Sequence, residues 1–310
     1  MGNGERGSIA YDPFAFSLAI GYKTKVMRRN LICLPLALCY LASAQDAKLR
    51  GGNILASETY SYRDLIRAGK LDLLTVPAFY KEQGIPGISY NDMFFKTVDD
   101  AFIDEVKAAV KKAGRVVTCY VIEGNLATAD EGRRAAQVEA DKKKMRAAAR
   151  LGAPVVRINV GATGSEATDS TEGVDRVVKI FNEELVPLAK ELNIRISMEN
   201  HGGVSKTAAN IVKIINATDP KCVGALVDFG NFPLEHKYEE VAAVAPYAFV
   251  THVKVNVFDE NGEAKEYDFP RVLGMLKKNH YKGPISIEYE GKGDPVEGVQ
   301  KTKALILKYW

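Results

Sequence analysis

A regular alternation of two kinds of segment is the feature of this sequence that most constrains its fold. From residue 52 onward, short runs rich in β-branched and aromatic residues alternate with amphipathic stretches at helical spacing, and the pair recurs eight times. Strict alternation of this kind predicts parallel strands joined by right-handed helical crossovers. Eight such units in about 260 residues match the size of a (β/α)8 TIM barrel. The sequence therefore predicts an α/β fold built as a TIM barrel.

The limits of the predicted elements follow from the apolar runs and the glycines between them. We expect strands at 53–59, 85–91, 115–122, 153–160, 194–199, 222–228, 249–255 and 284–289. We expect the intervening helices at 71–83, 97–113, 128–151, 171–192, 205–217, 238–244, 269–279 and 295–308. An open doubly wound sheet is the competing architecture, but no G-x-G-x-x-G sequence follows the first predicted strand.

A run of charged residues interrupts the predicted helix 128–151. Asp141 is followed directly by Lys142, Lys143 and Lys144, and Glu139 precedes them. Acidic and basic side chains three or four residues apart on a helix can pair with each other. We therefore interpret the run as a solvated outer face of the helix and not as a binding patch.

The first 44 residues do not fit the barrel pattern. A Met-Arg-Arg sequence at 27–29 precedes an apolar run at 31–41, and Ala-Ser-Ala follows at 42–44. This order is typical of a secretory signal peptide. We interpret 1–44 as an upstream extension and a signal peptide that starts at Met27, and 45–310 as the barrel domain. Export to the periplasm or the medium follows from this interpretation. A helix at the bottom of the barrel, in a cytoplasmic protein, is the alternative.

The charge balance argues against a nucleic-acid partner. The chain has 42 lysines and arginines against 39 acidic residues, for a formal net charge of +3. A duplex-binding protein usually shows a concentrated basic face. Beyond the amino terminus, no stretch is apolar for the roughly 18 residues that a membrane span needs. We therefore expect a small-molecule partner and no stable membrane insertion.

Polar residues stand where the last four predicted strands end, which is where barrels carry their functional groups. They are Glu199, Asp228, His252 and Glu288. Three carboxylates and one imidazole that converge on the barrel axis would repel and desolvate one another, and a divalent cation would offset that cost. An oxygen-rich set with one nitrogen suits Mn²⁺, Mg²⁺ or Co²⁺, and less well Zn²⁺. No thiolate joins the set, which argues against a structural zinc site.

Four segments at these strand ends carry a family resemblance. They are MENHGG at 198–203, VDFGN at 227–231, THVKV at 251–255 and ISIEYEG at 285–291. In this order, they resemble the xylose-isomerase-like TIM barrels of the sugar phosphate isomerase/epimerase group. That group includes ketose 3-epimerases, inosose dehydratase and relatives of endonuclease IV. The resemblance spans residues 52–308.

The resemblance implies that Glu199, Asp228, His252 and Glu288 are the metal ligands. It also implies that Glu199 and Glu288 are catalytic: one takes a proton from the substrate and the other returns one. A metal that holds a carbonyl and its neighbouring hydroxyl would acidify the adjacent C–H and stabilise an enediolate. The implied activity is that of a divalent-metal-dependent isomerase or epimerase acting on a sugar or sugar derivative.

Two positions differ from the best-known ketose 3-epimerases and leave alternatives open. Asn231 stands three residues after Asp228, where those enzymes usually have a histidine, and Lys254 is the nearby cation where they have an arginine. A metal-dependent lyase or dehydratase of an oxidised sugar or inosose therefore remains an alternative, and a non-catalytic carbohydrate-binding barrel is a third. The chain's four histidines are too few for a three-metal endonuclease.

Four residues are our candidates for substrate binding: His201, Lys254, Asn231 and Arg157. Lys254 lies two residues after His252 and so shares its face of the strand. By the same alternation, we expect Arg157 to point inward, with an outward position as the equal alternative. If the protein is exported, we expect its substrate to be a free or oxidised sugar, because phosphorylated sugars are cytoplasmic. Further candidates for lining the pocket, each with a structural role as an equal alternative, are Glu58, Tyr60, Tyr90 and Asp92.

Overall fold

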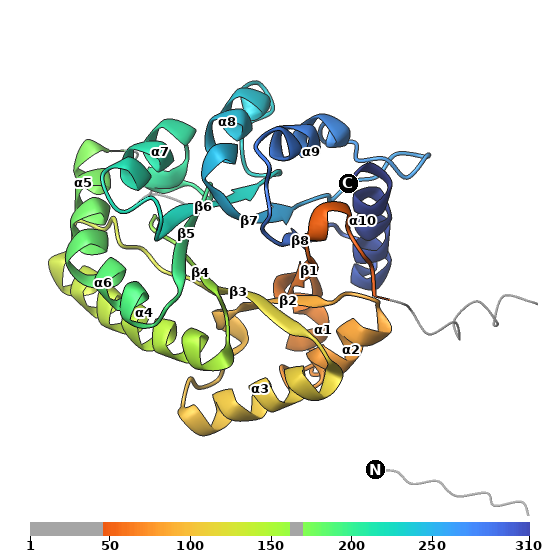
Figure 1. The fold of residues 1–310 in the computed structure, drawn as a ribbon, viewed down its shortest axis with the longest axis horizontal. Helices are drawn as coiled ribbons and strands as arrows, with labels where there is room; N and C mark the ends of the chain where they lie inside the picture. The colour runs from red at the N-terminus through yellow and green to blue at the C-terminus, as the bar shows by residue number, and fades with distance from the viewer. Residues whose placement is uncertain (1–45, 162–169) are drawn as a thin grey trace, which may run out of the picture. The chain divides into compact units, whose positions relative to one another are not determined.

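The computed structural model describes residues 46–161 and 170–310. Within these residues, eight parallel strands form a closed barrel in the order of the sequence, with helices around its outside (Figure 1). The last strand pairs with the first and closes the barrel. The predicted TIM barrel is thus confirmed, whereas the predicted signal peptide lies outside the described residues.

All eight predicted strands are present, each shorter than its expected range, and β7 begins one residue before its predicted start. They are β1 Leu55–Glu58, β2 Gly87–Asn91, β3 Val116–Ile122, β4 Val155–Ile158, β5 Arg195–Glu199, β6 Val223–Asp228, β7 Ala248–Val253 and β8 Ile285–Ile287. Side chains two residues apart on a strand share a face. Val155, Leu226 and Val250 form part of a buried apolar cluster. Two residues later on the same strands come Arg157, Asp228 and His252, so polar groups lie above an apolar layer.

The helices follow the predicted order, with one unexpected short helix after β1. They are α1 Arg63–Arg67, α2 Val76–Glu82, α3 Asp100–Ala113, α4 Glu131–Leu151, α5 Thr171–Ile180, α6 Val186–Glu191, α7 Ala208–Asn216, α8 Lys237–Val244, α9 Phe269–Lys278 and α10 Pro295–Tyr309. Gly114 and Gly152 end α3 and α4 in the left-handed conformation. No helix among the described residues is long and apolar enough to cross a membrane.

The predicted helix 171–192 is divided into α5 and α6. A π-helical turn, Phe181–Leu185, joins the two. Pro187 lies in the first turn of α6, and proline has no backbone N–H to donate to the preceding turn. A local widening of the helix accommodates the lost hydrogen bond.

The charged run on α4 is not wholly a solvated face, and this prediction was wrong for two of its residues. Asp141 is 0% exposed. The Nζ of Lys144 lies 2.5 Å from the buried Oδ2 of Asp92. The reason is that α4 packs its flank against the segment after β2. Lys143 is exposed as predicted.

Candidate metal centre

The carboxyl ends of the last four strands converge at one end of the barrel. Glu199 ends β5, Asp228 ends β6, His252 lies near the end of β7, and Glu288 directly follows β8. One potential ligand atom from each side chain lies within 4.8 Å of those of the other three, and all four residues are buried. The structure therefore brings together the four residues that the sequence predicts as metal ligands.

Backbone pairing holds Asp228 in place. Asp228 lies opposite His252 in the β6–β7 register. The side-chain amide of Asn200 donates to the Asp228 carbonyl at 2.9 Å, and its oxygen accepts the Asp228 N–H at 2.8 Å. Oδ1 of Asp228 accepts the N–H groups of Gly230 and Asn231. These contacts fix the carboxylate and leave Oδ2 for another partner.

Arg157 holds the carboxylate of Glu199. The Nη2 of Arg157 lies 2.6 Å from Oε2 of Glu199, and its Nη1 lies 2.7 Å from Oε1 of Glu123. Burial opposes ionisation of Glu199, but the charges of Arg157 and His252 hold its pKa well below the usual value. Glu199 is therefore a carboxylate at neutral pH. Arg157, our candidate for substrate binding, has both terminal nitrogens engaged by carboxylates.

Lys254 points into the barrel, as its spacing from the β7 histidine predicts. Its Nζ lies 2.9 Å from Oε2 of Glu288, 3.3 Å from Oδ2 of Asp228 and 3.2 Å from Oε1 of Glu290. Burial opposes the positive charge, but these carboxylates raise the pKa of Lys254. The ammonium group therefore lies against the ligand group and is engaged by its acidic side chains.

Asn231 bridges two of these charged groups. Its side-chain oxygen accepts from Lys254 Nζ at 3.2 Å, and its amide donates to Oε1 of Glu199 at 3.2 Å. Neither Asn231 nor Lys254 lines the pocket described below. Both stand behind the ligands, where they fix carboxylates.

Glu288 is paired with a second buried glutamate. Glu58 ends β1, is 0% exposed, and accepts a hydrogen bond from Asn91 Nδ2 at 2.9 Å. Burial and the neighbouring Glu288 raise the pKa of Glu58 well above its usual value. Burial acts the same way on Glu288, but Lys254 and His252 outweigh it and lower the pKa of Glu288. Of this pair, Glu58 is therefore the group that holds a proton more strongly.

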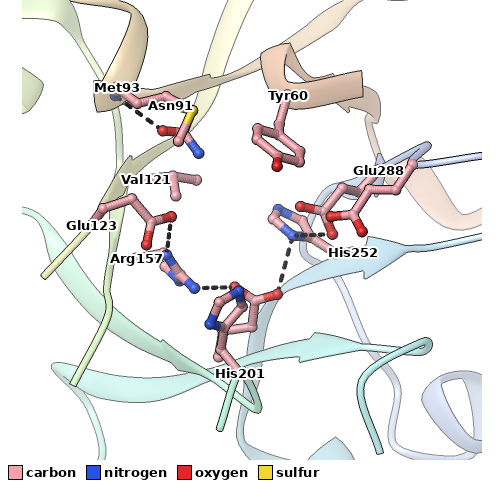
Figure 2. A pocket seen from close by; sticks show the side chains of 11 residues that line it. Tyr60, Asn91, Met93, Val121, Glu123, Arg157, His201, His252 and Glu288 are labelled. Carbon is pink, nitrogen blue, oxygen red and sulfur yellow. Dashed lines mark hydrogen bonds and ion pairs between the residues drawn. The ribbon is translucent and has the colours of Figure 1, made fainter. Parts of the chain in front are cut away.

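His252 lies between two ligand carboxylates (Figure 2). Its Nδ1 is 3.6 Å from Oε1 of Glu199 and 3.5 Å from Oε2 of Glu288. Both ring nitrogens of His252 are buried and form no hydrogen bond among the described residues. Oδ2 of Asp228 and Oε2 of Glu288 are likewise buried without a hydrogen bond there, and their contacts are ion pairs with Lys254 and, for Glu288, with His252. Buried polar atoms without partners are costly. A divalent cation would satisfy them together, so the residues present fit the predicted metal.

A pocket of about 190 Å³ opens beside the ligand group (Figure 2). Glu199, His252 and Glu288 form one side of it, with His201 and Glu290. His201, our second candidate for substrate binding, has a buried Nδ1 without a hydrogen-bond partner among the described residues. The rest of the lining comes from the first half of the barrel: Tyr60, Asn91, Met93, Val121, Glu123 and Arg157.

Glu123 is one of the pocket residues that the sequence analysis missed. It directly follows β3, and its carboxylate contacts Arg157 and accepts from Asn159 Nδ2 at 3.0 Å. The strand-end rule that identified the four ligands would also have found it at the third strand. Tyr90 and Asp92 do not line the pocket.

Comparisons with known proteins agree with this geometry. The family described as xylose isomerase-like TIM barrel matches residues 77–309. The structure of a D-psicose 3-epimerase in the presence of D-fructose has a TM-score of 0.64 at 14% identity, covering 83% of this chain and 99% of that one. The 3-keto-D-glucoside 4-epimerase from E. coli has a TM-score of 0.62 at 20% identity, covering 76% and 94%.

A xylose isomerase-like TIM barrel protein from Mycobacterium smegmatis in complex with magnesium has a TM-score of 0.62 at 17% identity, covering 83% of this chain and 96% of that one. A curated relative, the C-glycoside deglycosidase alpha subunit of Arthrobacter globiformis, is 33% identical over 77 residues. That match spans 23% of this chain and only 22% of the relative. The family match covers most of the chain, together with all four ligand-bearing strands, and the chain therefore belongs to the xylose isomerase-like TIM barrel family.

Proposed function

We propose that the protein is a divalent-metal-dependent isomerase or epimerase that acts on a sugar or sugar derivative through an enediolate. The observation that carries the proposal is the placement of Glu199 and Glu288. Arg157 forms an ion pair with Glu199 and Lys254 forms one with Glu288, both carboxylates lie beside His252, and both line the same pocket. Two ionised carboxylates around one reacting carbon provide a base and, once protonated, an acid.

A divalent cation held by Glu199, Asp228, His252 and Glu288 would polarise the substrate carbonyl and so acidify the neighbouring C–H. Glu199 and Glu288 divide the proton transfer between them. One carboxylate accepts the proton from carbon, and the other, once it has taken a proton from solvent, delivers that proton to the same or the adjacent carbon. Arg157 keeps Glu199 from rotating, because its guanidinium holds Oε2 at 2.6 Å. Lys254 does the same for Glu288.

Proteins with this fold support the proposal. Two of them are named as epimerases, of D-psicose and of a 3-keto-D-glucoside, and a third holds magnesium. The identities of 14–20% establish the fold alone. The choice of substrate therefore has to be tested with a panel of ketoses, 3-keto-glycosides and inososes.

The test is proton exchange in deuterated water with added Mn²⁺, followed by NMR. Deuterium incorporation without loss of water is the expected result. Glu199→Gln and Glu288→Gln should each slow exchange by about 10²-fold or more. Glu105→Gln makes the same change of charge on the exposed face of α3 and should leave the rate unchanged. If no panel sugar exchanges and the protein only binds them, the carbohydrate-binding alternative is correct.

A lyase that uses the same enediolate is the second candidate function. The position of His201 in the pocket is the observation that favours it. Its imidazole lines the pocket with a buried Nδ1 free of partners among the described residues. Such a group could protonate a departing hydroxyl or glycosyl group. The curated relative from Arthrobacter globiformis, named as a deglycosidase, supports this direction. A dehydrated or cleaved product in the same panel, lost in His201→Ala while deuterium exchange persists, would establish the lyase.

A further inference from the structure

We propose that the substrate is an uncharged sugar unit whose hydroxyls, remote from the reacting carbon, bind to Glu123, and that Glu123 and Glu290 exclude phosphorylated and carboxylated sugars. The inference rests on the proposed function, because it takes the reacting carbon to lie at the metal centre. It adds a substrate class and two specificity-determining residues to that function.

Glu123 is placed as a rigid acceptor of hydroxyl groups. Arg157 Nη1 lies 2.7 Å from Oε1, and Asn159 Nδ2 donates to Oε2 at 3.0 Å. The side chain is nevertheless 34% exposed, whereas the side chain of Glu199 is 3% exposed. Each carboxylate oxygen has two acceptor sites, so one on each oxygen remains for the substrate. Adjacent hydroxyls of a sugar present two donors at suitable spacing.

The position of Glu123 matches the far end of a bound sugar. It lies across the pocket from Glu288 and His252 (Figure 2). The cavity of about 190 Å³ between them has room for about six water molecules at roughly 30 Å³ each. That space is on the scale of one sugar unit. A substrate with its carbonyl at the metal centre would therefore direct its remote hydroxyls to Glu123.

No free cation lines this pocket among the described residues. Histidines aside, Arg157 is the one basic side chain in the lining. Its two terminal nitrogens are held by Glu123 and Glu199. Lys254, directly behind the lining, is held by acidic side chains in the same way.

Glu290 adds a second exposed carboxylate to the wall. Its side chain is 33% exposed, and Oε1 lies 3.2 Å from Lys254 Nζ. Together, Glu290 and Glu123 give the open part of the pocket a negative charge. Arg157 and Lys254 do not cancel this charge, because both are already paired with carboxylates. A phosphate or carboxylate on the substrate would meet like charge without a basic partner, and such juxtaposition strongly disfavours binding.

Matched pairs of sugars test the substrate class. The probes are D-fructose with D-fructose 6-phosphate, and methyl 3-keto-D-glucoside with methyl 3-keto-D-glucuronide, each with Mn²⁺ in deuterated water. We expect kcat/KM for exchange to be roughly a hundredfold higher for the neutral member of at least one pair. Equal or faster exchange with the charged members would overturn the substrate class and leave the proposed function standing. No exchange with any of these probes or with the inososes of the wider panel would defeat both.

Variants of Glu123 distinguish an effect on substrate binding, seen in KM, from an effect on the catalytic step, seen in kcat. Glu123→Gln should raise KM for the neutral sugar by about tenfold or more, with a much smaller change in kcat, because hydrogen bonds to a charged acceptor are lost. It should also reduce the preference over the charged partner. Glu123→Asp keeps the charge and should keep that preference, while its shorter reach raises KM.

Further measurements distinguish a loss of substrate recognition from a general loss of structure. Glu290→Gln should weaken the exclusion of the charged sugars while leaving the metal content, measured by mass spectrometry, unchanged. Glu105→Gln, on the outer face of α3, should leave both KM and the charge preference unchanged. If Glu123→Gln leaves KM and the charge preference at wild-type values, Glu123 does not bind the substrate and the proposal is wrong.

Discussion

Asp141 places its carboxyl group on the packed flank of α4, out of reach of water. Its Oδ1 accepts a hydrogen bond from Gln137 at 2.7 Å, and its Oδ2 has no partner among the described residues. Burial raises the pKa of Asp141 to about 7, against the influence of Gln137 and Lys144. The folded protein therefore holds this proton through a range of pH in which the unfolded chain has lost it.

Asp141→Asn should stabilise the protein above pH 7 and have little effect near pH 4. The ordinary pKa is 3.8 and the folded value is about 7. As pH rises between these values, the unfolded chain releases its proton first, so the wild type loses up to about 4 kcal/mol that asparagine retains. Urea unfolding at the two pH values measures the difference.

The exposed Asp64 provides the control for this prediction. Asp64→Asn should change stability by the same small amount at both pH values, because Asp64 lies in water on α1. If Asp141→Asn also shows equal effects at pH 4 and pH 8, the carboxyl group of Asp141 does not titrate in this range.

The convergence of single residues at the site could be predicted only where the local pattern specifies their positions. Glu199, Asp228, His252 and Glu288 each end an apolar run, which indicates their position. The partners of Arg157 could not be predicted, because its contacts join strands that are distant in sequence. The burial of Asp141 depends on the packing of α4, and its charged neighbours in sequence indicate the opposite.

At the scale of elements, the alternation of patterns was sufficient to order all eight strands, because each parallel strand is a short apolar run of its own. The ends were less well predicted. The first predicted strand is two residues longer at its amino end than β1, and the predicted helix 71–83 begins in turns before α2. The π-helical turn at Phe181–Leu185 depends on local hydrogen bonding, which the spacing of apolar residues in the sequence does not predict.

Gly224 shows how closely β6 and β7 are packed. A Cβ added there would lie 2.7 Å from the ring of Phe249 and 2.7 Å from the backbone oxygen of Tyr247. Gly224→Ala should therefore destabilise the protein by about 1–3 kcal/mol, since the backbone cannot move aside without distorting the strand that carries Asp228. Thermal or urea unfolding measures the loss.

Gly274 offers the opposite case in α9. A Cβ there would contact nothing within 4 Å. Gly274→Ala should stabilise the protein by about 0.5–1 kcal/mol, because alanine favours the helix. A Gly224→Ala protein as stable as wild type would show that the two strands are more loosely packed than the structure indicates.

At the scale of the molecule, the metal centre should contribute to stability as well as to chemistry. The four ligands come from β5, β6, β7 and the residue after β8, so a cation would bind these strands together only in the folded barrel. Mn²⁺ at about a hundred times its Kd should stabilise the fold by about 2.7 kcal/mol. For a domain of this size, Tm should rise by roughly 5 to 10 °C.

Scanning fluorimetry with Mn²⁺ and with a chelator checks this expectation. Asp228→Asn, which removes one ligand charge without a change of shape, should abolish the shift in Tm. A wild-type protein whose Tm does not respond to any of Mn²⁺, Mg²⁺ or Co²⁺ would contradict the assignment of the metal centre.

The barrel divides its tasks between its two halves of sequence. The ligand residues come from the second half, and Tyr60, Asn91, Glu123 and Arg157, which complete the pocket lining, come from the first. The 2.6 Å ion pair between Arg157 and Glu199 joins the halves at the site. New substrates could therefore evolve by exchange of the amino-terminal half-barrel with that of a relative, and an arginine at the fourth strand is the residue such a chimera would have to keep.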